Sequence, residues 1–154
     1  MSPVFRVFYL LLIMAGCCTT KTDNLLNNMP QGIKGYVTEL VGDQMPGPGK
    51  EKNPGKPLAT TIYVYEATLL SQVDRKNDEP FYSAIRSKFV KSFDSDKEGF
   101  FAADLPPGKY SLFTKVDGKF FASVFDGEGT IAPVIVEENK ITGVNIIVNA
   151  KATY

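Results

Sequence analysis

Residues 93–115, FDSDKEGFFAADLPPGKYSLFTK, decide the fold because they join three strand-like segments through two turns. The first turn, residues 94–99, places Asp and Ser side chains where they can accept hydrogen bonds from nearby backbone N–H groups, and it ends in a glycine. The second turn, residues 105–108, contains two prolines, which exclude helix because proline has no N–H group and restricts the residue before it. Gly108 is expected at positive φ, where it would turn the chain into the following strand.

Strand-like segments continue on both sides of this stretch. Residues 60–67 alternate aliphatic and tyrosine side chains, so both faces need cover and this strand is expected at the centre of a sheet. Asp117-Gly118 predicts a tight hairpin between alternating apolar runs. Further strands are expected at residues 33–41, 88–93, 119–125, 130–137 and 141–148.

Two segments do not read as strands. Residues 42–57 are rich in Gly and Pro, which predicts an exposed loop that is either a contact loop or a solvated insertion. The insertion at residues 68–87 is charged at 74–79 and interrupted by Pro80, and it is expected to be a loop with a short helical turn at residues 80–85. The pattern as a whole predicts an all-β fold, an antiparallel Greek-key β-sandwich of about seven to nine strands.

The charge and residue content exclude several classes of function. The 154 residues include 17 Lys and Arg, 17 Asp and Glu, and no histidine. A chain without net charge offers no electrostatic footprint for nucleic acid. The missing histidine removes the commonest general base and the usual zinc ligand. We therefore expect no catalytic, cofactor or metal residue, and a protein that is not an enzyme.

The amino terminus has the pattern of a secretory signal. Residues 1–16 carry a basic residue, an apolar run too short to span a membrane, and small residues before Cys17. This spacing resembles a bacterial lipobox, which implies that Cys17 is the lipid attachment site and that acyl chains hold the mature protein on the membrane. The alternative is an ordinary cleaved signal with incidental cysteines. Residues 17–31 are then an acylated tether, and residues 32–154 the folded domain.

The turn pattern D-x-D-x-x-G-x-F followed by L-P-P-G-x-Y-x-L, in residues 94–112, resembles the carboxypeptidase regulatory-like domain. That domain is a transthyretin-like (prealbumin-like) β-sandwich found in secreted and outer-membrane proteins of Bacteroidetes-type bacteria. The resemblance implies an outer-membrane lipoprotein in the cell envelope, facing either the periplasm or the exterior. Transthyretin-like folds include hydroxyisourate hydrolases, whose histidines this sequence lacks, so that activity is not carried over.

Two groups of side chains are candidates for ligand binding. Asp94, Asp96 and Glu98 alternate before a glycine and resemble the start of a calcium loop, although a polar turn in which the carboxylates cap backbone N–H groups is the competing interpretation. The aromatic pairs at 63/65, 100/101 and 120/121 suit either a platform for sugars or peptides, or a core.

These patterns lead to two expectations for function. The first is a lipid-anchored envelope protein whose single sandwich is a non-catalytic structural or accessory binding module. The alternative is a peptide- or glycan-binding accessory subunit of an outer-membrane uptake system that uses residues 42–57 or 68–87. In both cases the membrane is a partner through the lipid anchor, and nucleic acid is not a partner.

Overall fold

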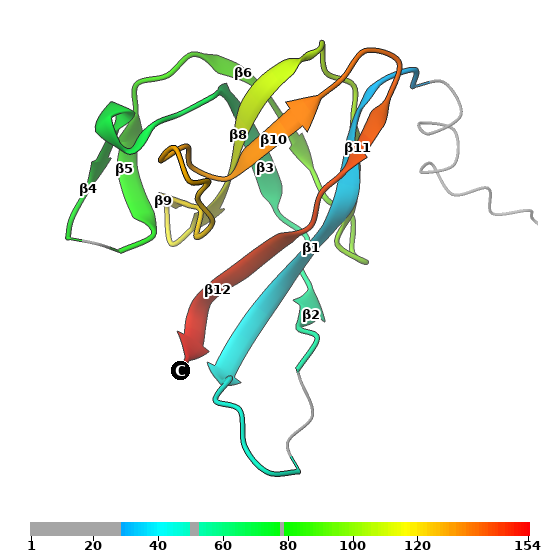
Figure 1. Cartoon of the computed structure of the whole chain (residues 1–154). Coiled ribbons are helices and arrows are strands. Elements are labelled where there is room, and N and C mark those ends of the chain that lie inside the picture. The colour runs from blue at the N-terminus through cyan, green and yellow to red at the C-terminus, as the bar shows by residue number, and fades with distance from the viewer. Residues whose placement is uncertain (1–28, 50–52, 78) are drawn as a thin grey trace, which may run out of the picture.

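The computed structural model describes residues 29–49, 53–77 and 79–154, and nearly all of its regular structure is β-strand (Figure 1). The described residues form twelve strands, eight of which have four or more residues. The elements are β1 (Gly32–Asp43), β2 (Lys56–Pro57), β3 (Thr61–Glu66), a 3₁₀ turn η1 (Leu70–Gln72), β4 (Val73–Arg75), β5 (Phe81–Ile85), β6 (Phe89–Asp94), β7 (Phe100–Ala103), β8 (Gly108–Val116), β9 (Lys119–Phe121), β10 (Pro133–Val136), β11 (Ile141–Gly143) and β12 (Ile146–Thr153).

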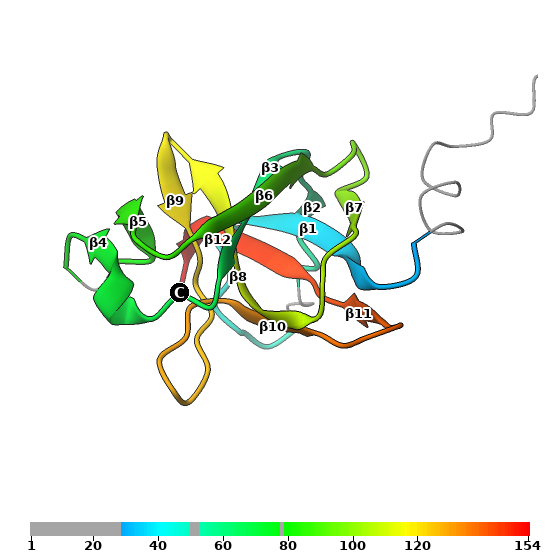
Figure 2. The same ribbon diagram turned by 90° about the horizontal axis from the view of Figure 1, so that it is seen from above.

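The strands form two sheets that pack as a sandwich, which confirms the predicted all-β fold. In the first sheet β11 and then β12 pair along one side of β1, and β7 and β2 pair along its other side. The second sheet has the order β4-β5-β9-β8-β3-β6, with β10 also paired to β8. Seen from above, the second sheet lies over β1 and β12 and its strands run across them (Figure 2).

The main core lies between the two sheets and follows the period of two along each strand. Ile62 and Val64 of β3 point into it and are fully buried, as is Val37 of the long strand β1. Leu112 of β8 and Phe101 of β7 pack against them. Burial of each such side chain stabilises the fold by about 1.5–3 kcal/mol, so the alternation seen in the sequence is the main source of stability.

The predicted centre of the sheet and the predicted hairpin are both confirmed. β3 pairs with β6 on one side and β8 on the other, so both of its edges are covered, and the face with Ile62 and Val64 is buried. β8 and β9 form the hairpin, and its turn residues have the positive φ values of a tight turn, 50° at Asp117 and 78° at Gly118.

The helical turn expected at residues 80–85 is wrong, because most of this segment is the strand β5. The segment's apolar side chains decide its structure: Phe81 and Tyr82 pair with Phe121 and Phe120 of β9, and Tyr82 is fully buried. A single turn of 3₁₀ helix does occur in the insertion, but earlier, at η1. Tertiary packing has here outweighed the charged and proline-containing surroundings.

The first sheet departs from the antiparallel expectation at two pairings. β1 runs parallel to β11 and to β12, while the other pairings between named strands are antiparallel. The sequence predicted one strand at residues 141–148, but this strand is interrupted at Val144 and Asn145. There Asn145 Oδ1 accepts a hydrogen bond from Tyr36 N at 3.2 Å. A Cβ on Gly35 would lie 1.6 Å from Val144 O, so the close approach at this break requires glycine.

The second turn of the 93–115 stretch is held by a tyrosine and not by a glycine. Gly108 does not have the positive φ that was expected, which corrects that prediction. Instead the Tyr110 hydroxyl donates to Pro106 O at 2.9 Å, so the tyrosine four residues on closes the turn as in the tyrosine corner of β-sandwiches. The space near Gly108 is limited by this ring, whose hydroxyl would lie 3.2 Å from an added Cβ.

Candidate functional site

Aromatic side chains gather on the outer face of the second sheet, away from the main core. We call Tyr63, Tyr65, Phe89, Phe120 and Lys115 the outer aromatic surface. The strand register brings them together, since Tyr65 of β3 lies opposite Phe89 of β6, and Phe120 of β9 lies opposite Lys115 of β8. Because side chains alternate in a strand, this set shares one face while its sequence neighbours enter the core.

The rings of the outer aromatic surface contact one another edge to face. Tyr63 and Phe120 have centroids 5.3 Å apart at 90°, and Tyr65 lies 5.9 Å from Phe120 and 5.4 Å from Phe89. Beneath them Phe113, almost fully buried, lies 5.7 Å from Tyr65. Such contacts add about 0.5–1.5 kcal/mol each beyond area burial, so the arrangement is rigid before any ligand arrives.

Lys115 places a cation on this surface. Its Nζ lies 5.0 Å from the centre of the Tyr63 ring and 4.9 Å from that of Phe120, within the range of a cation–π contact. The side chain is exposed, and no carboxylate within the described part of the chain forms an ion pair with it. The surface thus combines aromatic rings with one positive charge, which contacts two of them and forms no ion pair with a described residue.

The tyrosine hydroxyls of this surface can form hydrogen bonds with a ligand. Neither Tyr63 nor Tyr65 donates a hydrogen bond to another described residue, and both side chains are partly exposed. Burial raises the pKa of Tyr65, and the neighbouring Tyr63 raises it further, so the hydroxyl stays protonated as a donor. By contrast, the buried Tyr82 hydroxyl donates to Ala122 O at 3.3 Å.

The carboxylates of the acidic turn at residues 94–99 accept hydrogen bonds from nearby groups, as the interpretation of this segment as a polar turn predicts. Asp96 Oδ1 accepts from Glu98 N at 3.0 Å and from Phe100 N at 2.8 Å, and Asp94 Oδ1 accepts from the Thr61 hydroxyl at 2.7 Å. Within residues 29–49, 53–77 and 79–154, no group of three or more His, Cys, Asp or Glu side chains is placed to hold a metal ion.

A second turn repeats this structure at residues 126–130. Asp126 Oδ1 accepts from Glu128 N at 3.0 Å and from Thr130 N at 2.7 Å, and both turns share the pattern D-x-E-G. Here the other carboxylate oxygen accepts from Lys109 Nζ at 2.9 Å, and this hydrogen bond is the main reason that the pKa of Asp126 lies far below its usual range and that of Lys109 above. The turn is therefore attached to β8.

The predicted aromatic pairs are only partly brought together. Tyr63, Tyr65 and Phe120 join one surface, but Phe101 and Phe121 belong to the core, and Phe100 packs on Tyr36 of β1. The sequence reasoning missed Phe89 and Lys115. The alternation of side chains in residues 88–93 and 113–119 could have indicated on which face of their strands these two residues lie. The strand order is also needed to show that they lie beside Tyr63, Tyr65 and Phe120.

The predicted lipid attachment site Cys17 lies outside the described residues. No helix in the described part of the chain is long and apolar enough to cross a membrane. Comparisons with protein-family models, curated proteins and solved structures found no match to the chain.

Proposed function

We propose that the chain is a lipid-anchored protein of the cell envelope, placed at the outer membrane, whose β-sandwich is a non-catalytic binding module. The sequence Met14-Ala15-Gly16-Cys17 supports the anchor, and the resemblance of residues 94–112 to a carboxypeptidase regulatory-like domain supports the envelope location. The absence of histidine from the sequence supports a binding role over a hydrolytic one.

The observation that carries the binding role is the outer aromatic surface, and the ligand class that suits it best is a glycan. The C–H faces of a sugar ring stack on the electron-rich faces of aromatic rings. The Tyr63 and Tyr65 hydroxyls supply donors for sugar hydroxyls, and Lys115 supplies a cation for a carboxylate where the sugar carries one. We therefore propose that the anchored protein uses this surface as a glycan-binding accessory subunit of an uptake system.

A glycan array with the full chain in detergent tests this proposal. Wild type should retain a class of oligosaccharide, and Tyr63→Ala should lower the affinity about tenfold, the equivalent of 1.4 kcal/mol. Tyr36→Ala is the matched control, because Tyr36 is exposed and pairs with a phenylalanine but lies on the first sheet. Failure to retain any glycan, or equal loss in both variants, would refute the glycan assignment.

The anchor has its own test. In cells that lipidate their envelope proteins, Cys17→Ser should leave the protein unprocessed or release it from the membrane fraction, while Cys18→Ser should change neither processing nor partitioning. Mass spectrometry of the mature amino terminus reads the result directly. An unmodified Cys17 in wild-type protein, with unchanged partitioning of Cys17→Ser, would show that residues 1–16 are an ordinary signal.

A further inference from the structure

The strand β12 has a free edge. It pairs with β1 along one side, and no described strand pairs with its other side. An unpaired strand edge presents a row of backbone N–H and C=O groups that complement another extended backbone. A register shift opposite residues 39–41 divides the β12 ladder into two regular parts, and Ile146–Val148 form the first of them.

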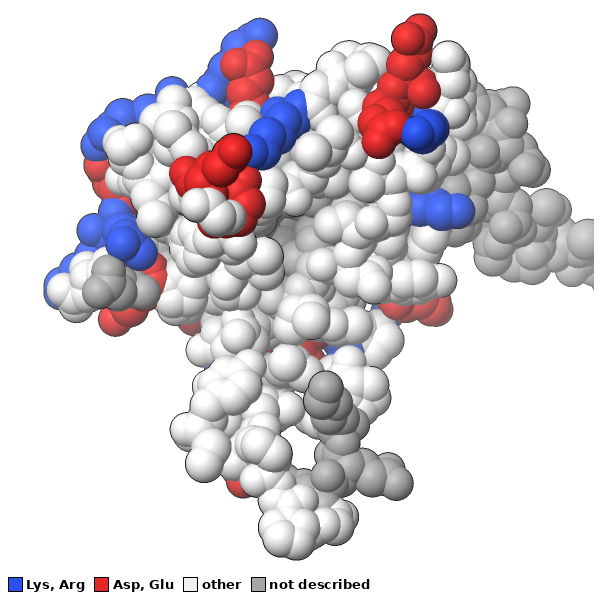
Figure 3. All heavy atoms as spheres, in the orientation of Figure 1, with Lys and Arg blue, Asp and Glu red and all other residues white. Residues whose placement is uncertain are grey.

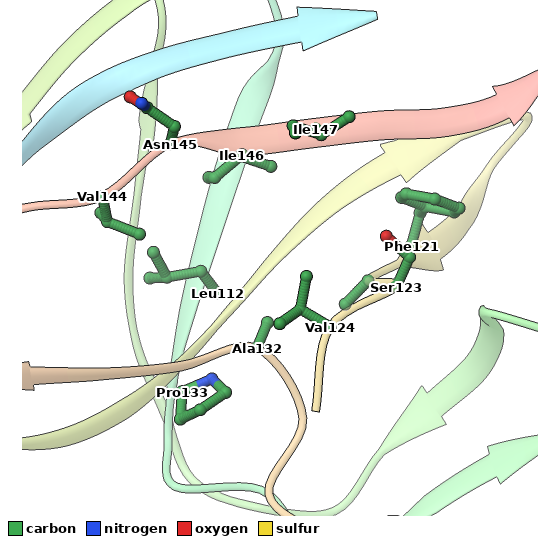
Figure 4. Close-up of a pocket in the computed structure, with 11 residues that line it drawn as sticks. Leu112, Phe121, Ser123, Val124, Ala132, Pro133, Val144, Asn145, Ile146 and Ile147 are labelled. Atoms are coloured by element: carbon green, nitrogen blue, oxygen red, sulfur yellow. The ribbon is translucent and has the colours of Figure 1, made fainter. Parts of the chain in front are cut away.

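An apolar crevice opens beside this edge, between the two sheets. In Figure 4 Ile146 at the start of β12 and Val144, just before that strand, point toward Leu112 of β8, and Val124 and Ala132 lie on the opposite wall. The crevice has a volume of about 90 Å³, several times the space that one water molecule needs, so it can admit an aliphatic side chain.

The mouth of the crevice exposes large aliphatic side chains. Val124 is 59% exposed and Ile147 is 48% exposed, and both line the crevice. Charged residues are absent from its lining within the described chain, and in Figure 3 few Lys, Arg, Asp or Glu side chains lie over β12 and the neighbouring end of β1. Exposed apolar surface of this kind, gathered at a strand edge, marks an interaction site.

One wall of the crevice is held in a strained conformation. Ala132 has φ of 41°, in the left-handed region that an alanine rarely occupies. Two hydrogen bonds fix it there: Ala132 N donates to Val124 O at 2.7 Å, and Leu112 N donates to Ala132 O at 3.1 Å. Strained residues of this type concentrate at binding sites, where the surrounding structure fixes them in place.

We propose that β12 and this crevice bind an extended segment of a partner protein by strand addition. The segment would pair its backbone with Ile146–Val148 and continue the first sheet, and one uncharged aliphatic side chain would enter the crevice. A charged side chain would be buried there without a partner, which excludes it. The binding site is separate from the outer aromatic surface, so this inference goes beyond the glycan role.

A synthetic peptide of alternating threonine and valine, with terminal lysines and one tryptophan, is the probe. The chain has no tryptophan, so peptide fluorescence anisotropy reports binding to the full chain in detergent micelles without background. The peptide should bind saturably and slow hydrogen exchange at residues 146–148. The same peptide with alternate backbone nitrogens methylated cannot pair along one edge, and it should lose at least tenfold in affinity.

Two protein variants locate the site. Val124→Asp places a charge at the crevice mouth and should lower peptide affinity at least tenfold. Ile135→Asp is the matched control, because Ile135 is 58% exposed, also aliphatic, and outside the crevice lining, and it should bind the peptide as wild type does. Circular dichroism melts establish that both variants are folded.

Four results would overturn the proposal. Equal binding of the methylated peptide would exclude backbone pairing. Equal loss in the two aspartate variants, or no saturable binding by wild type, would exclude the crevice. Light scattering that shows a dimer of this chain, with residues 146–148 protected from exchange before any peptide is added, would assign the edge to a second copy instead.

Discussion

Thr114→Val should make the protein more stable. Thr114 lies on β8, fully buried on the same side as Leu112, and its Oγ1 has no hydrogen-bond partner within the described part of the chain. Its backbone neighbours across the ladders are Ile62 and Phe121, both core residues. A buried hydroxyl without a partner costs about 1–3 kcal/mol, because it loses water and gains nothing in exchange.

Valine has the shape of threonine, so the replacement removes this cost without creating a cavity. We expect the free energy of unfolding to rise by about 1–2 kcal/mol, at the lower end of the penalty. For a domain of this size that corresponds to a melting temperature about 3–8 °C higher. Both residues are β-branched and suit a strand equally well, so strand propensity does not contribute to the difference.

Thr68→Val is the matched control for this prediction. Thr68 is also fully buried, but its Oγ1 donates to Glu66 O at 2.8 Å and lies 2.6 Å from Ser87 Oγ. Removal of that hydroxyl leaves partners unsatisfied and should lower the free energy of unfolding by about 1–3 kcal/mol. Urea unfolding followed by circular dichroism measures both variants. The reasoning fails if Thr114→Val is destabilised as Thr68→Val is, since the Thr114 hydroxyl would then have a partner.

Two further substitutions test the packing and the electrostatics. Gly35→Ala should destabilise the fold by more than about 2 kcal/mol, in the upper range for overpacking, or prevent folding, because the new Cβ would overlap Val144 O. Gly127→Ala is the control, because its Cβ would meet nothing within 4 Å. Thermal melts compare the stability of the two variants. Asp126→Asn should flatten the acid dependence of stability. Lys109 holds the folded-state pKa of Asp126 below its unfolded value, so the stabilising contribution is complete above the unfolded pKa and is lost as pH falls toward the folded pKa. The urea concentration at the midpoint of unfolding should fall less steeply from about pH 6 to pH 2 in the variant than in the wild type. Parallel curves for the two proteins would contradict a stabilising role of the Asp126 carboxylate.

Local patterns in the sequence predicted the parts of the fold that depend on neighbours along the chain. The alternation in residues 60–67 identified β3 and its place between two other strands, and Asp117-Gly118 identified the hairpin. The D-x-E-G pattern encodes its own turn twice, at Asp96 and at Asp126, because all of its hydrogen bonds close within five residues. Turns of this kind need no tertiary information.

The sequence could not supply what depends on strand order. The strand β5 exists because Tyr82 is buried against β9, which lies beside it only in the folded sheet. In the same way, the alternation of side chains along each strand shows which face Tyr63 and Phe120 occupy on their own strands. Only the strand order β9-β8-β3 brings the two residues close to each other. The free edge of β12 likewise depends on the sheet, because the sequence of residues 146–153 does not show whether another strand pairs with their second edge.

The two proposed binding surfaces lie on different layers of the sandwich, and this has a consequence for their independence. The outer aromatic surface is built on the outer face of the second sheet, whereas the crevice opens between the sheets at the edge of the first, and no residue of that surface lines the crevice. Ala122 of the crevice lining belongs to the cluster against which Ala132, Tyr63 and Phe120 pack, so the two surfaces are linked only through shared neighbours. Substitutions at positions that do not contact each other act nearly additively. Tyr63→Ala should therefore leave peptide binding unchanged, and Val124→Asp should leave glycan binding unchanged. Cross-effects in either variant would mean that the 122–132 segment, which contacts β8 through Lys109 and Leu112, couples the two surfaces.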